Sequence, residues 1–180
     1  MILFMIGYMG SGKSTIGRWL ADKLNSDFID TDKIIEEREG DSISNIFATR
    51  GEEYFRKAER DLLIELANDN TSEIRDIIIA TGGGMPCFFD NMELMNRSGC
   101  TIYLKCSAQL LAHHLKSAQN RRPLIRDLQP EEMVAFIERM LQGREPHYRL
   151  SQLVVDCDNN TNEQILLLVK EHIKQLKNEE

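Results

Sequence analysis

Short apolar runs alternate with longer amphipathic stretches along the whole chain. Residues 2–6 form a continuous apolar run, and residues 77–79 are three isoleucines, which is typical of a strand buried on both faces. After these runs come stretches in which an apolar residue recurs every three or four positions, which is the period of a helix. The pattern predicts strands over residues 2–6, 27–30, 76–80, 101–104 and 153–155.

Helical periodicity fills the segments between the predicted strands. Gly40-Asp41-Ser42 interrupts one helix and caps the next, and Pro130 suits the first turn of another. We expect the helix that begins at Pro130 to end at Gly143, because glycine commonly terminates helices. The predicted helices cover residues 15–24, 33–38, 52–67, 91–97, 108–116, 130–143 and 163–176, with a shorter one through 46 and 47.

Strands that alternate with helices predict an α/β fold, in which a parallel sheet is covered by helices on both faces. The chain contains no internal repeats or linkers, so we expect a single domain over residues 1–180. Ligands of such sheets bind beyond the carboxyl ends of the strands, where the candidate residues should lie. Residues 117–129 are polar and basic, with Pro123 among them, and we expect a mobile surface segment there.

Composition and charge narrow the classes of function. The chain is 42% hydrophobic and 28% charged, with a net charge of −7, and nucleic acids or anionic membranes require a basic face instead. No apolar run reaches the length of a membrane span. From the charge and the short apolar runs we expect neither nucleic acid nor membrane as a partner. The four cysteines lack metal-ligand spacing, so we expect free thiols in a reducing cytoplasm; they are Cys87, Cys100, Cys106 and Cys157.

A complete phosphate-binding loop follows the first predicted strand. Residues 7–15 match the pattern G-x-x-x-x-G-K-[ST], between an apolar strand and an amphipathic helix. Backbone N–H groups of such a loop face an anion, and the dipole of the following helix adds to the attraction. Lys13 would bridge the β- and γ-phosphates of a nucleoside triphosphate, and the hydroxyl of Ser14 would hold Mg²⁺.

Two further motifs follow predicted strands, and each has two interpretations. In Asp30-Thr31-Asp32 the two carboxylates could approach a substrate hydroxyl and the Mg²⁺ shell, or Asp32 could cap the following helix. Three glycines, Gly82, Gly83 and Gly84, follow the strongest predicted strand. They form either a floor whose backbone contacts a small ligand or a tight turn between strand and helix.

The arginines fall into three settings. Arg56, three residues before Glu59 on a helix, is expected to be a solvated charge with that carboxylate as its partner. Arg122 lies in the polar segment, where a basic residue could close over the triphosphate as a lid or simply keep a loop soluble. Arg144, just after the expected end of a helix, should be exposed.

Together these motifs resemble one family, shikimate kinase. The order G-x-x-G-x-G-K-S-T, D-T-D, F-R-x-x-E, T-G-G-G, R-P-L and R-x-P-x-Y covers nearly the whole chain, whereas the phosphate loop alone is shared with many other kinases. The resemblance implies transfer of the γ-phosphate of ATP to the 3-hydroxyl of shikimate, on the route to chorismate and the aromatic amino acids. It also implies a three-layer α/β/α P-loop kinase similar to nucleoside monophosphate kinases, with a central five-stranded parallel sheet and a mobile lid over about residues 117–127.

The resemblance also implies a role for each matching residue. ATP would be held by Gly10, Ser11, Gly12, Lys13, Ser14, Thr15 and Arg122, and Lys13, Asp32 and Arg122 would be catalytic. Mg²⁺ would bind Ser14, with Asp30 supporting its shell through water. Asp32 would bind the shikimate hydroxyls and orient or deprotonate the attacking one. The carboxylate of shikimate would be held by Arg56 and Arg144, with Glu59 positioning Arg56 and Gly82, Gly83 and Gly84 contacting the ring hydroxyls.

Some positions depart from the family pattern, and other functions stay open. The stretch 111–119 lacks the arginine usual near the lid, and His114 or Lys116 could replace it. The nearest alternative is a gluconate-type small-molecule kinase, which shares the loop and the architecture. A non-catalytic nucleotide-binding regulatory domain is the alternative from another class, although the intact set of Lys13, Ser14, Asp32 and Arg122 argues against it. The family precedent favours a monomer.

Overall fold

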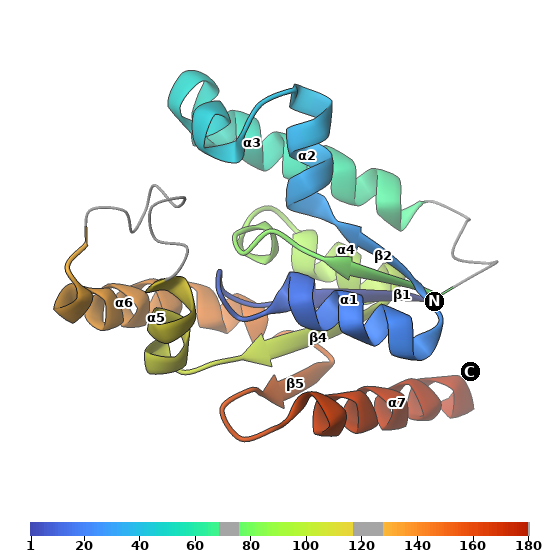
Figure 1. Cartoon of the computed structure of the whole chain (residues 1–180). Helices are drawn as coiled ribbons and strands as arrows, with labels where there is room; N and C mark the ends of the chain where they lie inside the picture. The colour runs from blue at the N-terminus through green and yellow to red at the C-terminus, as the bar shows by residue number, and fades with distance from the viewer. Residues whose placement is uncertain (69–75, 117–127, 180) are drawn as a thin grey trace.

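The computed structural model describes residues 1–68, 76–116 and 128–179. It contains one five-stranded sheet in the order β2-β3-β1-β4-β5, and every neighbouring pair of strands is parallel. Figure 1 shows the sheet between helices. The strands are β1 (Ile2–Ile6), β2 (Asp27–Asp30), β3 (Ile77–Ala80), β4 (Cys100–Lys105) and β5 (Leu153–Asp156). The expected α/β fold with a parallel sheet is thus confirmed.

The helices connect the strands in the predicted alternation. A 3₁₀ turn, η2 (Met85–Cys87), follows β3. One helix, α3, covers both of the helices that the sequence predicts on either side of Gly51. It kinks at Gly51, whose φ of 83° is not helical. The helices are α1 (Lys13–Leu24), α2 (Thr31–Glu39), α3 (Ile43–Ala67), α4 (Asn91–Ser98), α5 (Ala108–Lys116), α6 (Pro130–Tyr148) and α7 (Asn162–Glu179).

Alternate residues of the central strand β1 belong to two separate cores. Phe4 and Ile6 pack with residues of α3, α4, α5 and α6. Leu3 and Met5 pack with residues of α1 and α7 on the opposite face. Because successive side chains of a strand point to opposite faces, the continuous apolar run of β1 fills both cores. The fold therefore has three layers, with the sheet in the middle.

The helix α6 differs from its prediction at the carboxyl end. It continues through Gly143 and Pro146 to Tyr148, whereas the sequence predicted an end at Gly143. Proline lacks the N–H that would bond to the carbonyl of residue 142, but Gln142 is exposed, so water can satisfy that carbonyl. The buried side chain of Tyr148 anchors the added turn in the core.

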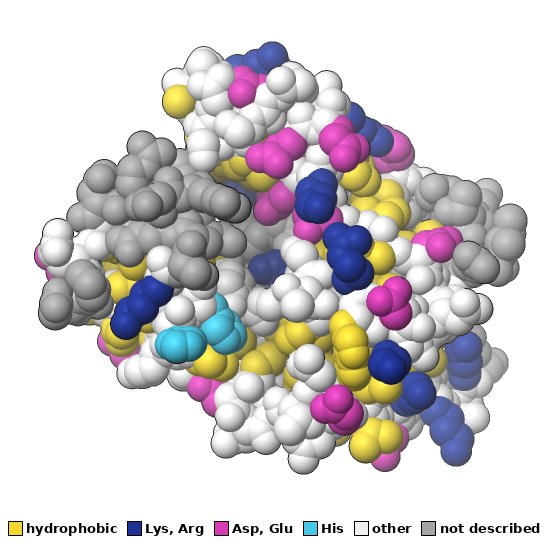
Figure 2. Space-filling model, viewed as in Figure 1, with side chains coloured by type: hydrophobic (Ala, Val, Ile, Leu, Met, Phe, Trp, Pro, Cys, Tyr) yellow, Lys and Arg dark blue, Asp and Glu magenta, His cyan; other side chains and the backbone are white. Residues whose placement is uncertain are grey.

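Charged side chains are distributed over the surface that Figure 2 draws. Lys and Arg side chains are interspersed with Asp and Glu among the described residues of this face. Within the same part of the chain, no helix has both the length and the apolar character needed to cross a membrane. The segment expected to be a mobile lid, about residues 117–127, lies outside the described residues.

Candidate active site

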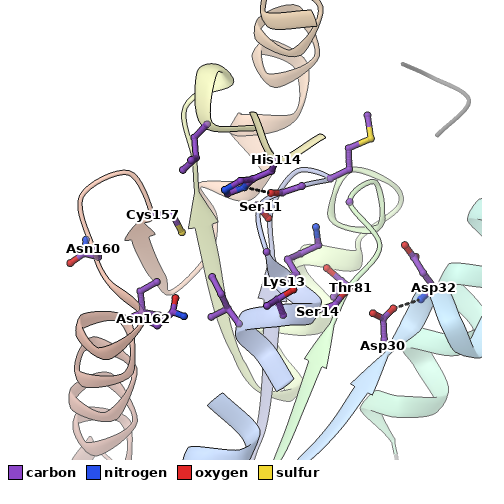
Figure 3. A pocket seen from close by; sticks show the side chains of 18 residues that line it. Ser11, Lys13, Ser14, Asp30, Asp32, Thr81, His114, Cys157, Asn160 and Asn162 are labelled. Atoms are coloured by element: carbon purple, nitrogen blue, oxygen red, sulfur yellow. Dashed lines mark hydrogen bonds between the residues drawn. The ribbon is translucent and has the colours of Figure 1, made fainter. Parts of the chain in front are cut away.

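A cavity of about 610 Å³ opens at the carboxyl edge of the sheet. Its wall combines the loop between β1 and α1, the start of α2 and the residues that follow β3. Figure 3 shows Lys13, Ser14, Asp30 and Asp32 around this space, contributed by different elements. Motifs that are far apart in the sequence therefore meet in one cavity.

The phosphate loop leaves the first turn of α1 open to an anion. Gly12 occupies the N-cap position with a φ of 89°, a left-handed conformation that a side chain would strain. Gly12 has no side chain with which to cap this helix, and the first turn contains no acidic residue. The N–H groups of that turn and the positive end of the helix dipole are therefore available to phosphate oxygens.

Lys13 bends back across the loop from which it projects. Its side chain is buried, and Nζ donates hydrogen bonds to the carbonyl oxygens of Gly7 at 2.8 Å and Tyr8 at 2.9 Å. The loop is closed by a further bond of 3.1 Å, from the backbone N–H of Ser11 to the Tyr8 carbonyl. The ammonium group is therefore already fixed beside the cavity that Ser14 and Thr15 also line.

Asp30, and not Asp32, caps the helix α2. The carboxylate of Asp30 accepts hydrogen bonds from the N–H groups of Asp32 at 3.2 Å and Lys33 at 3.4 Å. The alternative that assigned the cap to Asp32 is therefore wrong, because the helix begins at Thr31 and Asp32 already lies in its first turn. Both carboxylates line the cavity.

Thr31 joins the ends of two neighbouring strands. Its buried hydroxyl donates to the carbonyl of Ala80 at 3.3 Å and accepts from the N–H of Gly82 at 3.0 Å. Asp30 and Ala80 are partners in the β2–β3 pairing, so this link continues the register past the strand ends. It fixes the glycine segment beside the Asp30-Thr31-Asp32 turn, a contact for which the sequence offers no signal.

Arg56 is buried, although the sequence predicted a solvated charge. Its side chain lies on α3 and is 8% exposed, with the guanidinium 4.3 Å from the centre of the Phe88 ring. Nη1 donates to Glu59 at 2.6 Å, while Nε and Nη2 donate to one oxygen of Glu52 at 3.1 and 2.9 Å. The i,i+3 partner was predicted correctly, but the aromatic ring that shields the pair comes from a distant part of the chain.

Glu59 is the most deeply buried charged side chain of the site. It is 0% exposed, and within the described part of the chain its Oε1 atom has no hydrogen-bond partner. Burial raises the pKa of this carboxyl to about 7, against the opposing effect of Arg56, and the negative charge of Asp32 raises it further. The positive charge of Arg144 also acts on Glu59, so both arginines lie near one carboxylate.

Side chains pack so closely against residues 82–84 that a residue larger than glycine would not fit. A Cβ atom at Gly82 would lie 2.4 Å from Oε1 of Glu59 and 2.7 Å from Oδ1 of Asp32. At Gly84 it would lie 2.4 Å from Nη1 of Arg56. Larger residues would displace these charged groups, so close packing requires glycine here, and we call Gly82, Gly83 and Gly84 the glycine floor.

Arg144 is half-buried, because α6 continues past Gly143 and carries it toward the core. The expectation of an exposed side chain is therefore wrong. Its guanidinium lies 5.4 Å from the centre of the Tyr8 ring and interacts with the hydroxyl of Tyr148. The hydroxyl of Tyr148 donates to the carbonyl of Gly83 at 2.6 Å, so Arg144 and the glycine floor share one support. Burial raises the pKa of Tyr148, which keeps this donor protonated.

Of two further residues with expected roles, His114 can be placed in the structure and Arg122 cannot. Nδ1 of His114 lies 2.8 Å from the carbonyl oxygen of Gly10, and the side chain lines the cavity. Arg122 lies outside the described residues. The sequence motifs gave no role to Glu52, Thr31 or Tyr148. Of these, Tyr148 had a signal, since it follows Arg144 by four residues and a longer helix would have put both on one face.

Comparisons with known proteins extend this picture to the whole chain. A family model described as shikimate kinase matches residues 9–176. A shikimate kinase of Parabacteroides distasonis is 45% identical over 161 residues, which cover 89% of this chain and 90% of that protein.

Solved structures show the same likeness. Shikimate kinase from Bacteroides thetaiotaomicron has a TM-score of 0.85 and 38% identity, and the match covers 98% of both chains. Shikimate kinase from Acinetobacter baumannii, solved in complex with shikimate, has a TM-score of 0.84 and 30% identity, over 98% of this chain and 94% of that one. The similarity therefore extends over the segments that carry Arg56, the glycine floor and Arg144 as well as the phosphate loop.

Proposed function

The chain belongs to the shikimate kinase family, and we propose that it transfers the γ-phosphate of ATP to the 3-hydroxyl of shikimate. The products are shikimate 3-phosphate and ADP, in the biosynthesis of chorismate and the aromatic amino acids. One observation carries the choice of acceptor: Arg56 and Arg144 both lie near Glu59, and both contact the glycine floor or its support. Two arginines beside such a floor suit a small molecule with one carboxylate and several hydroxyls.

The nucleotide half of the site binds and polarises the triphosphate. The N–H groups of residues 10–15 surround the phosphates, and Lys13 moves from the carbonyls of Gly7 and Tyr8 to bridge the β- and γ-phosphates. The hydroxyl of Ser14 would bind Mg²⁺, which prefers oxygen ligands, and the carboxylate of Asp30 would support the shell of the ion through water. The bound ion would neutralise the charge that develops on the phosphates.

The acceptor half orients shikimate for attack. Arg56 and Arg144 hold its carboxylate, and Glu59 and Tyr148 keep these two arginines in place. The backbone of Gly82, Gly83 and Gly84 contacts the ring hydroxyls from below. Asp32 accepts a hydrogen bond from the attacking hydroxyl and orients or deprotonates it, so that the reacting oxygen lies in line with the γ-phosphate.

Arg122 supplies the remaining positive charge in this proposal. By the family resemblance, the segment 117–127 closes over the nucleotide, and Arg122 stabilises charge on the transferring phosphoryl group. In the sequence, Arg122 precedes α6, and α6 carries Arg144, so the proposed lid and one of the shikimate-binding arginines are close along the chain. The expected effect of Arg122→Ala is a lower kcat with little change in the KM for shikimate.

A coupled assay of ADP release from ATP tests the proposed acceptor directly. The protein is offered shikimate, gluconate and nucleoside monophosphates in parallel reactions with Mg²⁺. We expect turnover with shikimate only. Stimulation by gluconate would support the gluconate-type kinase, and ATP binding without turnover on any acceptor would support a regulatory domain.

We also infer that the enzyme is a cytoplasmic monomer. ATP is available in the cytoplasm, and the four cysteines are free thiols, which a reducing compartment maintains. Among the described residues, the large exposed hydrophobic side chains are spread over several elements, among them α3, which carries Ile64, and α7, which carries Leu167. Light scattering coupled to gel filtration tests the monomer, and a mass of twice 20.7 kDa or more would contradict it.

A further inference from the structure

Two cysteines follow neighbouring strands at equivalent positions. Cys106 comes directly after β4, and Cys157 comes directly after β5. The parallel register pairs Lys105 with Asp156, and the N–H of Cys157 donates to the carbonyl of Lys105 at 2.8 Å. The two cysteines are therefore the next pair in the register, with side chains on the same face. Neighbouring strands lie about 4.8 Å apart, which is within the Cα separation that a disulfide spans.

This pair of thiols lies against the phosphate loop. Cys106 is 5% exposed, and its Sγ atom lies 3.9 Å from the carbonyl oxygen of Ser11. Cys157 is half-buried and lines the same cavity as Lys13 and Ser14, as Figure 3 shows. One thiol therefore contacts the loop that binds phosphate, and the other can be reached from the cavity.

The two thiols differ in reactivity because they interact with each other. The interaction between the two side chains lowers the pKa of Cys157 and raises the pKa of Cys106. Burial raises the pKa of Cys87, and it raises that of Cys100 to about 11. Among the four cysteines, Cys157 is thus the thiol that ionises most readily, and the thiolate is the nucleophile in thiol oxidation.

We propose that Cys106 and Cys157 are a site of reversible oxidation, at which a hydroperoxide converts the two thiols to a disulfide and lowers the affinity for nucleotide. The thiolate of Cys157 attacks one peroxide oxygen, the O–O bond breaks, and the leaving hydroxide takes up a proton. The sulfur of Cys106 then loses its proton and attacks the sulfur of the resulting sulfenic acid, which releases water. Overall two thiols and one hydrogen peroxide give one disulfide and two water molecules.

The loss of nucleotide affinity follows from the contacts of Cys106. A disulfide draws its sulfur toward Cys157 and away from the Ser11 carbonyl, and the backbone of the loop must adjust. The side chain of Cys157, which is part of the cavity wall, becomes fixed at the same time. This consequence rests on the proposed nucleotide site, whereas formation of the disulfide does not.

Mass spectrometry and calorimetry test the two parts separately. Reduced protein is treated with hydrogen peroxide, digested without reductant and searched for a peptide pair that joins Cys106 to Cys157. Affinity for ATP is measured on reduced, oxidised and dithiothreitol-treated protein, and we expect a dissociation constant about tenfold higher after oxidation that dithiothreitol restores.

Three variants control the experiment. Cys157→Ser and Cys106→Ser should each abolish the linked peptide and the effect of peroxide on ATP affinity, and Cys106→Ala replaces the latter if a buried hydroxyl impairs folding. Cys87→Ser removes a thiol that is also half-buried and should retain both effects. No linked peptide, or a linked peptide with unchanged ATP affinity, would overturn the inference. Reduced protein that binds no ATP would instead refute the proposed nucleotide site, while the linked peptide still decides whether the disulfide forms.

Discussion

Single side chains of the acceptor half depend on a few buried contacts. Arg56 is held between Glu52 and Glu59 over an aromatic ring, and Arg144 is held by Tyr148. Each guanidinium therefore has a fixed orientation before a carboxylate arrives. Pre-organisation of this kind reduces the entropy that binding costs, so the two arginines should set affinity for the acceptor more than affinity for the nucleotide.

The first prediction concerns Arg144. Replacing it with alanine should raise the KM for shikimate about 10- to 100-fold, because a hydrogen-bonded charge pair is lost, while the KM for ATP changes much less. Initial rates at varied concentrations of each substrate provide the measurement. Arg149→Ala is the matched control, since Arg149 is exposed at the same helix end and pairs with Glu145 at 2.7 Å. Equal effects of Arg144→Ala on both KM values would remove this arginine from the substrate site.

The second prediction concerns the proton on Glu59. Its pKa is about 7 in the folded protein and 4.5 ordinarily, so between these values the folded state keeps a proton that the unfolded state has lost. The free energy of unfolding that this carboxyl contributes is therefore fully present below pH 4.5 and decreases as the pH rises toward 7 and above.

Glu59→Gln has no such proton to lose. Relative to this variant, the wild-type protein should lose up to about 3 kcal/mol of unfolding free energy between about pH 4.5 and pH 8. Urea unfolding of both proteins across that range provides the measurement. Parallel pH profiles for the two proteins would show that the pKa of Glu59 is close to its ordinary value.

For single side chains, the sequence predicted contacts within an element better than contacts between elements. The pairing of Arg56 with Glu59 follows from helix geometry, and it is present. Arg56 is covered by rings of its own helix and also by Phe88, which is 32 positions further along the chain. No local sequence pattern predicts this last contact. The interpretation of Asp32 as the cap of α2 was wrong because helix ends are uncertain by one or two residues from sequence.

Among the elements, the glycine segment after β3 couples the two halves of the site. Thr31 holds it at one end, Tyr148 supports its middle, and Arg56 lies against Gly84. None of the three glycines has a positive φ, so they are required by close packing and not by the conformation of a turn. The interpretation as a tight turn alone therefore does not account for them.

The third prediction replaces Gly84 with alanine. The added methyl group would lie 2.4 Å from Nη1 of Arg56, and that guanidinium is fixed by two carboxylates and an aromatic ring. We expect a KM for shikimate at least about tenfold higher, because a displaced arginine misplaces the substrate carboxylate. Steady-state kinetics with a fixed, saturating ATP concentration measure the effect, and an unchanged KM would mean that Arg56 does not bind the acceptor.

The fourth prediction uses the glycine in α6 as the matched control. Gly143 lies within the helix, and a Cβ atom there would have no neighbour within 4 Å. Alanine should stabilise the protein by about 0.5–1 kcal/mol, which corresponds to a rise of about 1–4 °C in Tm. Thermal unfolding followed by circular dichroism measures the change. A lower Tm would contradict a continuous helix at this position.

Helix and strand bounds are predicted well where neighbouring residues in the sequence determine them. All five strands were predicted within one or two residues, and β1 and β3 had the clearest signal, because buried parallel strands are continuous apolar runs. The end of α6 was missed because Gly143 and Pro146 both discourage a helix, and the burial of Tyr148 that sustains it is a tertiary effect.

For the whole molecule, the strand order β2-β3-β1-β4-β5 determines which motifs can cooperate. With β1 at the centre, the phosphate loop lies between the Asp30-Thr31-Asp32 turn and the glycine floor on one side and the cysteine pair on the other. The alternation of strands and helices predicted a parallel sheet with its ligands at one edge. It did not predict the strand order, because neighbours in the sheet are not neighbours in the chain.

The most direct measurement for this molecule follows the transferred phosphate itself. ATP labelled at the γ-phosphate is incubated with the protein, Mg²⁺ and shikimate, and the products are separated and counted. We predict one labelled shikimate 3-phosphate for each ADP formed, and no labelled product when gluconate replaces shikimate. Release of the label as free phosphate, or its transfer to gluconate in preference to shikimate, would contradict the proposed function.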